Sequence, residues 1–437
     1  MTMRPDPTFH ASPKLAMEAP PENFAYTLLL SPDFSKPDAL AVVDVKPGSP
    51  TFSQIVHTVT MPYTGDEFHH CGWNACSSSL SPLTGHAFLE RRYLIIPGLR
   101  SSRIYIVDTK PDPTKAKIHK IIEPEEVFKK TGYSRPHTVH CGPEGIYVST
   151  LGGGGKDGTN GPPGVFIMDC ETFDILGRWE IDRGPQTKHY DFWWNLPRDY
   201  MVSSEWALPP QFENGIVPED LLSNKYGHHI HFWDLRARRN VQTIDLGANH
   251  QMGLEVRPAH DPVREYGFLG VVVDTTNLEG SIWTWWREGG KFHIEKTATI
   301  PPEPAPKDQL PPLLQGFGAV PPLVTTSTFP WMTGSSTSPA GEPARCVSTT
   351  SPTRGSRSLR ARSTSAASLA VRPTRAATCM QAVRRWSRSA ATASACTGPT
   401  RSTRRGTTSS IPTACQALRS WPMRTRAVAS SWQRTTG

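Results

Sequence analysis

The chain has 437 residues and a formal charge of +8, but this charge is divided unevenly. Residues 325–437 contain 17 Arg, one Glu and neither Lys nor Asp, a net charge of +16, so residues 1–324, with 30 basic and 38 acidic residues, carry −8. A basic chain of this kind usually indicates nucleic-acid binding. Because the average charge describes neither part, we expect no nucleic-acid partner.

The carboxy-terminal part also lacks the residues that build a core. Ser, Thr, Ala and Arg fill 75 of its 113 positions, whereas Leu, Ile, Val and Phe fill nine. Such a segment cannot bury enough apolar surface to offset the loss of chain entropy on folding. We therefore predict disorder for residues 325–437, and also for the Pro-rich start, residues 1–25. The folded domain is expected over residues 26–324.

No targeting segment is recognisable in the sequence. The start has no apolar stretch of the secretory type, and no run approaches the roughly 18 apolar residues of a membrane span. Residues 1–324 hold four cysteines without CxxC spacing, which favours thiols in a reducing compartment over a disulfide scaffold. These features predict a cytoplasmic protein with no membrane span.

A two-part pattern recurs five times before residue 325. A β-branched or aromatic run ends in Asp or Trp, and a second alternating run follows after a few polar residues. The first runs are 41–44, 104–108, 165–169, 231–234 and 282–285, and their four Asp residues lie 64, 61 and 65 positions apart. Such strand-like runs without long helical stripes predict an all-β fold, and regular repeats of this length predict a β-propeller. Two packed sandwiches are the alternative.

Histidines gather in three places that the repeat assigns to junctions between blades. They lie in DEFHHCGWNAC (66–76), HTVHC (137–141) and HHIH (228–231). Imidazole and thiolate are ligands for copper or zinc, and a site needs three or four converging groups. A single histidine is more often a hydrogen-bonded core or surface residue, but the clustering indicates a metal site. Since adjacent residues of a strand face opposite sides, at most one of His69 and His70 is expected at it.

The same motifs resemble the selenium-binding protein family, whose members include methanethiol oxidases. The matching elements include DE-FHH-GWN-C (66–76), SSRIYIVD (101–108), HTVHC (137–141), YDFWW (190–194), SSEWA (203–207) and YG-H-I-FWD (226–234). The resemblance runs from about Tyr26 to Val324. It implies a propeller of about seven blades, of which this chain would form about five.

The resemblance also implies an oxidoreductase that uses copper to oxidise methanethiol with O2 and water. The products would be formaldehyde, hydrogen sulfide and hydrogen peroxide. Carried over position by position, the motifs imply copper ligands at His69, His70, His137, His140 and His229, and selenium binding at Cys76. No catalytic residue is assigned. We further expect Asp66 or Glu67 to orient a ligand imidazole.

The family pattern stops at Val324, and the tail has the composition of a neighbouring reading frame. Read one base earlier, Thr codons become codons for Asp, Asn, Tyr or His, and Ser codons become codons for Phe, Leu, Ile or Val. Residues 326–337 can then encode DIDISLDDRFLY, and residues 397–414 can encode YWTNSLYSTWDDQFYPDG, both similar to the family. We therefore expect a single-base frameshift near Thr325, in the gene or in its sequence, and an open, aggregation-prone propeller with an incomplete metal site.

Two other functions remain open from the sequence. One is a non-catalytic propeller that binds selenium or a protein partner. The other is an RNA-binding protein that uses the arginines and tryptophans of residues 325–437.

Resequencing the gene around codon 325 tests the frameshift: we expect a one-base change that restores the family pattern in some copies of the gene. An intact reading frame in every copy, with the same tail, would contradict it.

Overall fold

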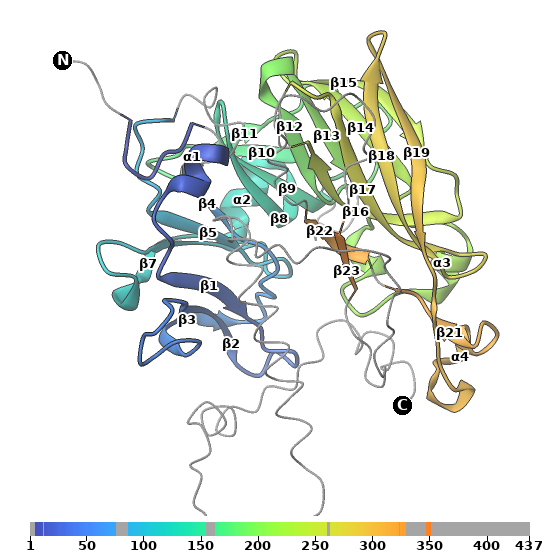
Figure 1. Cartoon of the computed structure of the whole chain (residues 1–437), viewed down its shortest axis with the longest axis horizontal. Coiled ribbons are helices and arrows are strands. Elements are labelled where there is room, and N and C mark those ends of the chain that lie inside the picture. The colour runs from blue at the N-terminus through green and yellow to red at the C-terminus, as the bar shows by residue number, and fades with distance from the viewer. Residues whose placement is uncertain are drawn as a thin grey trace, which may run out of the picture.

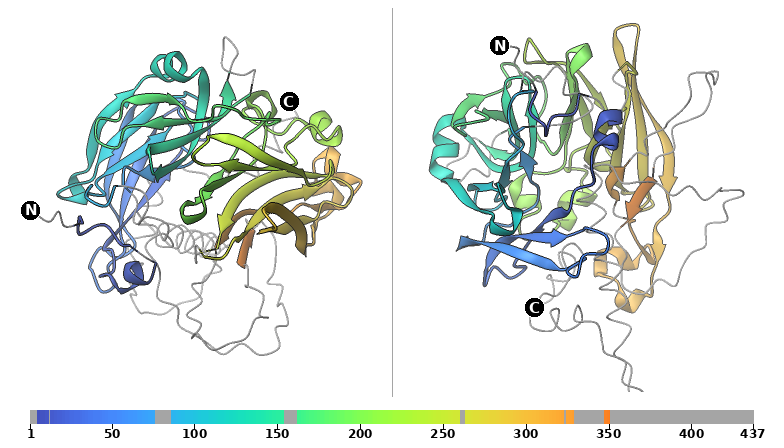
Figure 2. Two further views of the ribbon diagram at one scale, coloured as in Figure 1. Left: turned by 90° about the horizontal axis from the view of Figure 1, so that it is seen from above. Right: turned by 60° about the vertical axis from the view of Figure 1, so that its left-hand side comes forward.

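The computed structural model describes residues 5–11, 13–75, 86–153, 162–259, 263–322, 324–328 and 347–350. Antiparallel sheets dominate this part of the chain, and its longest helix, α2 (Pro124–Thr131), has eight residues. The sheets follow one another in chain order round an arc (Figures 1 and 2). The predicted all-β, propeller-like fold is confirmed.

Four sheets have four strands each, ordered as they follow in the chain. The second sheet contains β4 (Gly72–Trp73), β5 (Tyr93–Pro97), β6 (Ile104–Asp108) and β7 (Lys117–Ile122). The third contains β8 (Tyr133–Gly142), β9 (Gly145–Gly153), β10 (Val165–Met168) and β11 (Ile175–Arg178). The fourth contains β12 (Phe192–Asn195), β13 (Tyr200–Ser204), β14 (His229–Asp234) and β15 (Arg239–Asp245). The fifth contains β16 (His250–Pro258), β17 (Tyr266–Asp274), β18 (Gly280–Glu288) and β19 (Lys291–Ile300).

The first sheet has three strands, β1 (Phe24–Leu29), β2 (Pro37–Asp44) and β3 (Ile55–Thr64). Two strand pairs follow the fifth sheet: β20 (Glu303–Pro304) with β21 (Ala319–Val320), and β22 (Val324–Thr328) with β23 (Val347–Thr350). The remaining short helices are α1 (Pro13–Glu18), α3 (Pro218–Leu222) and α4 (Pro312–Gln315). β22 lies against β16 and β17, which places it next to the fifth sheet.

The repeat seen in the sequence is the hairpin of the third and fourth strands of each blade. The five first runs fall in β2, β6, β10, β14 and β18, and three of the second runs form β3, β7 and β19. The recurring Asp ends the third strand, where its carboxylate accepts backbone N–H groups of the turn: Asp108 from Lys110 at 3.0 Å, and Asp234 from Ala237 at 2.7 Å. The regular Asp spacing therefore reflects turn chemistry. By this alignment β1 to β3 are second to fourth strands, and the described residues give the first sheet no inner strand.

Apolar faces of successive sheets pack against each other and form the core. Ile95 and Ile106 of the second sheet meet Val148 and Phe166 of the third in one buried cluster. Tyr147, Phe192 and Met201 share the next cluster, between the third and fourth sheets. Phe232, Val256 and Trp285 belong to the cluster between the fourth and fifth sheets. This packing brings inner strands together, so that β4 lies beside β8 and β12 beside β16.

Both segments predicted to be disordered contain some described structure. Residues 5–11 and 13–25 include α1, and the Asp6 backbone N–H donates to the Ala87 carbonyl at 2.9 Å, so neighbouring chain holds this start in place. In the tail the pair β22–β23 is described, and the rest of residues 325–437 lies outside the described residues.

Candidate metal centre

Three of the five histidines implied as copper ligands meet where two blades adjoin. The ring centroids of His70 and His137 are 4.2 Å apart, and those of His69 and His137 are 5.2 Å apart. The His69 and His70 rings are 5.7 Å apart. The expectation that at most one of His69 and His70 would serve a given site assumed a strand. Both instead precede β4 in a non-strand segment, where both rings can turn toward His137.

An irregularity of β8 positions His137. The pairing of β8 with β9 shifts register between Pro136 and Val139, and Arg135 has a φ of 58°. A bulge of this kind bends a strand and redirects side chains. His137 is fully buried as a result, although it lies on an inner strand that carries polar groups.

Hydrogen bonds indicate which nitrogen of His137 carries the proton. The Thr138 hydroxyl donates to the Tyr190 carbonyl at 3.3 Å, so it accepts from the His137 Nδ1 that lies 3.0 Å away. A hydroxyl has one proton to donate, and a neutral imidazole carries one N–H. His137 Nε2 is then the nitrogen with the lone pair, and this buried atom has no hydrogen-bond partner among the described residues. A metal ion would satisfy it.

Burial keeps His70 and His137 neutral. Burial, together with the charges that neighbouring imidazoles would carry, lowers the pKa of His70 to about 3 and holds the pKa of His137 well below its usual range. Neutral imidazole is the form that binds metals. The His69 side chain is exposed to solvent, so the cluster has one open side.

His140 faces a second set of groups. Its ring centroid lies 4.1 Å from that of Trp193, and its Nε2 is 3.8 Å from an Asp191 carboxylate oxygen. Burial lowers the pKa of His140, and Asp191 partly opposes this. Asp191 also accepts from Arg257 Nη1 at 2.8 Å and from the Val256 N–H at 3.0 Å. Burial would raise the pKa of Asp191, but Arg257 and His140 outweigh it and lower that pKa to about 2.

His229 lies in a different network. Its Nδ1 is 3.0 Å from one carboxylate oxygen of Glu205, and His231 Nε2 is 3.0 Å from the other. The hydrogen bond to Glu205 is the main reason that the pKa of His229 is raised. His229 also forms a group of possible ligands with His228 and Asp245, whose ligand atoms lie within 4.8 Å of one another. In the described part of the chain no ring contact joins His229 to His69, His70 or His137.

The two acidic residues before the His pair form hydrogen bonds with arginine and tyrosine side chains. Asp66 accepts from Tyr105 at 2.7 Å and from Arg103 at 3.1 Å, and Glu67 accepts from Arg100 Nε at 3.0 Å. These contacts hold the segment that carries His69 and His70. The role expected for Asp66 or Glu67, to orient a ligand imidazole, stays a prediction. Cys76, expected to bind selenium, lies outside the described residues.

Two residues beside the cluster were not predicted. The Tyr190 ring centroid is 4.4 Å from that of His137 and 6.2 Å from that of His70. His189 is fully buried, its pKa is lowered to about 4 by burial, and neither of its ring nitrogens has a hydrogen-bond partner among the described residues. Tyr190 belongs to the aromatic run 190–194 of the sequence, but nothing in the sequence marked His189.

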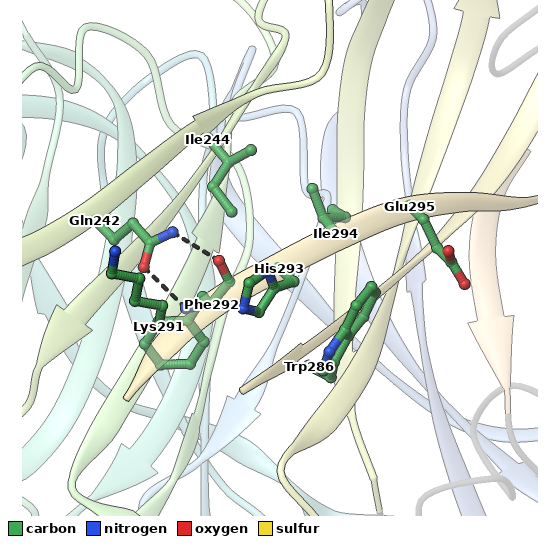
Figure 3. A pocket seen from close by; sticks show the side chains of 8 residues that line it. All are labelled: Gln242, Ile244, Trp286, Lys291, Phe292, His293, Ile294 and Glu295. Atoms are coloured by element: carbon green, nitrogen blue, oxygen red, sulfur yellow. Dashed lines mark hydrogen bonds between the residues drawn. The ribbon is translucent and has the colours of Figure 1, made fainter. Parts of the chain in front are cut away.

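A hollow of about 520 Å³ lies elsewhere, between the outer strands β15 and β19 (Figure 3). The Gln242 side chain bridges these strands, donating to the Phe292 carbonyl at 2.7 Å and accepting from the Phe292 N–H at 2.9 Å. His293, which lines the hollow, stacks on Trp286. None of the histidines implied as copper ligands lines it.

Comparison with known proteins agrees with the histidine motifs. The model of the 56 kDa selenium-binding protein family matches residues 3–329. The chain belongs to this family. An X-ray structure of a hypothetical selenium-binding protein from Sulfolobus tokodaii superposes with a TM-score of 0.70 and 53% sequence identity, covering 74% of this chain and 70% of that one.

Curated members of the selenium-binding family are also similar. A methanethiol oxidase of Xenopus laevis is 41% identical over 296 residues, which cover 67% of this chain and 60% of that protein. Selenium-binding protein 3 of Arabidopsis thaliana is 40% identical over 270 residues, 61% of this chain and 55% of that protein. The chain thus spans about 60% of the length of these relatives. None of the helices described here is long and apolar enough to cross a membrane.

We predict that Arg257→Met destabilises the fold by about 3–5 kcal/mol at pH 7, because it leaves the Asp191 carboxylate buried and unpaired. Asp191, whose folded pKa is lowered from 3.8 to about 2, adds stability above pH 3.8 and loses it as the pH falls toward 2. Urea unfolding at pH 7 measures the difference.

The matched control is Arg239→Met. Arg239 lies 4.0 Å from Asp182, and both side chains are more than half exposed, at 58% and 56%. An exposed pair of this kind contributes about 1 kcal/mol or less. Equal losses in the two variants would show that the Arg257–Asp191 pair has no special role.

Proposed function

We propose that this chain carries part of a methanethiol oxidase centre in which His69, His70 and His137 hold a copper ion. The lone pair of His137 Nε2, buried and without a hydrogen-bond partner among the described residues, carries this proposal. The names of the relatives support the activity, and the three adjoining imidazoles supply a donor set that suits both oxidation states of copper.

The residues fit such an ion with a modest adjustment. In the described part of the chain, the nitrogen atoms of His69, His70 and His137 do not all lie within 4.8 Å of one another, as the ligand atoms of two other groups do. The three rings must therefore turn before they can share one ion. His69 and His70 lie outside regular strands, which leaves them room to turn. When bound, copper supplies electron exchange with O2 and lowers the pKa of a coordinated thiol.

The surrounding side chains define the substrate space in this proposal. Tyr190 covers one side of the His70–His137 pair, and the exposed side of His69 leaves access for a molecule as small as methanethiol. His140 is neutral at pH 7 because burial lowers its pKa, so it can accept the thiol proton, and Asp191 would stabilise the resulting imidazolium. In the overall conversion, methanethiol, O2 and water in equal amounts give formaldehyde, hydrogen sulfide and hydrogen peroxide in the same amounts.

We further propose that this chain is impaired in that activity. The match to the family model ends at residue 329 although the chain continues to residue 437, and the first sheet has three described strands where the next four have four. A propeller normally pairs its last blade with its first, which removes free strand edges. A frameshift near Thr325 would deprive the chain of that closure, favour aggregation and leave the copper site short of a ligand from the missing blades.

The alternative is a non-catalytic propeller that binds selenium, as the names of the family and of the Arabidopsis relative suggest. Cys76 would be its binding residue. Turnover separates the two functions, because selenium binding alone requires neither O2 nor methanethiol.

We predict no methanethiol-dependent peroxide or sulfide from the chain as given, and turnover once a one-base change restores the expected frame. In the restored chain His137→Ala should lower turnover by more than about 100-fold, since removing a ligand costs more than the roughly 10–100-fold loss from groups that only orient ligands. Peroxide and sulfide are measured after copper loading.

His293→Ala is the control, because His293 is exposed and lines the hollow on the outer strands. It should leave turnover unchanged. Full turnover by the chain as given would contradict the proposed impairment. A copper-loaded, restored chain that binds selenite but never turns over methanethiol would favour the non-catalytic function.

A further inference from the structure

A second group of metal-binding side chains lies in the core between the second and third sheets. The ligand atoms of His86, Cys141 and Cys170 all lie within 4.8 Å of one another. Cys141 is 2% exposed and Cys170 is 4% exposed, and both belong to the apolar cluster between these sheets. The three residues come from the segment before β5, from the end of β8 and from the turn after β10.

This group is separate from the cluster of His69, His70 and His137. Cys141 follows His140 on β8, and successive residues of a strand point to opposite faces. His140 accordingly contacts Trp193 of the fourth sheet, whereas Cys141 packs in the cluster with residues of the second sheet. His137, which lies at the irregular part of β8, contacts His70 and Tyr190 and does not belong to the apolar cluster that contains Cys141, so an ion at Cys141 would be separate from the proposed copper centre.

The backbone around the three residues is well anchored. The Asn74 side chain donates to the Glu90 carbonyl at 3.2 Å and to the Cys170 carbonyl at 3.5 Å, which links two of the three segments. The same side chain accepts from the Tyr93 N–H at 3.0 Å. The Asp169 carboxylate accepts two N–H groups, at 2.8 Å each, from the turn that follows Cys170. Ordering of these segments therefore does not depend on the ion.

We propose that His86, Cys141 and Cys170 bind a zinc ion. Zinc, with Zn–S of about 2.3 Å and Zn–N of about 2.0 Å, brings its ligand atoms to roughly 3.5–3.8 Å of one another, so these three atoms, which lie within 4.8 Å, need to move by at most about 1 Å. A water molecule would take the fourth position of a tetrahedral site. Binding releases the two thiol protons, so two thiolates balance the charge of Zn²⁺ and the neutral imidazole adds none. A monovalent soft ion such as Cu⁺ would leave a net negative charge among apolar side chains, which is costly. No disulfide joins Cys141 to Cys170.

Zinc-dependent protection of the two thiols tests this proposal in the full chain. The protein is loaded with Zn²⁺ or stripped with a chelator, treated with an alkylating reagent, digested, and mapped by mass spectrometry. We expect zinc to slow alkylation of Cys141 and Cys170 at least about tenfold, because bound thiolates are poor nucleophiles. Cys71, which belongs to no such group among the described residues, should react at the same rate in both samples.

Variants then assign the ligands. Cys170→Ser should abolish the zinc protection of Cys141 and remove one equivalent of zinc from the purified protein, whereas Cys71→Ser should do neither. Since the protection experiment on the unchanged chain needs no variant, a misfolded Cys170→Ser protein does not obscure the result. Equal alkylation of Cys141 with and without zinc, or a Cys141–Cys170 disulfide in protein purified without reductant, would overturn the proposal. Neither outcome depends on copper or on methanethiol turnover.

Discussion

Apolar contact between successive sheets decides where the chemical groups of this chain lie. The third and fourth sheets each bury one face against the preceding sheet and the other against the following sheet, as the clusters around Ile106, Phe192 and Phe232 show. The outer strands can then face solvent, and the inner strands meet one another. Inner strands lie away from the outer surface of the blades. Their polar side chains therefore lie near those of the neighbouring blade.

Desolvation at that position sets the chemistry of the histidines. A buried imidazole favours its neutral form, and a neutral imidazole offers one nitrogen lone pair. Thr138 and the Tyr190 carbonyl hold the His137 proton on Nδ1, which leaves the lone pair on the buried Nε2. The same burial would penalise a lone carboxylate, and Asp191 is therefore held by Arg257 and the backbone of β16. Neutral metal ligands and a compensated ion pair thus arise from one physical constraint.

The sequence revealed the outer half of each blade better than the inner half. The runs ending in Asp108 and Asp234 predicted β6 and β14, because these third strands alternate regularly and end in an Asp that closes the turn. Inner strands such as β8 carry polar groups and a register shift, so they lack that pattern. The expectation that His69 and His70 face opposite sides was wrong because it assumed a regular strand, whereas both residues lie in a segment without strand structure.

The candidate site was only partly predictable. Histidine-rich motifs marked His69, His70 and His137, which the structure brings together, but they equally marked His229, which pairs with Glu205. Tyr190 joins the first group through ring contacts with His70 and His137, which lie far from it in the chain. Such contacts depend on how the blades pack, and no local pattern encodes them.

Electron paramagnetic resonance of Cu²⁺ bound to the full chain tests the central claim most directly. The account predicts a spectrum with hyperfine coupling to three imidazole nitrogens, and coupling to two after His137→Ala. A spectrum that shows oxygen ligands alone, or one that His137→Ala leaves unchanged, would contradict a copper centre at His69, His70 and His137.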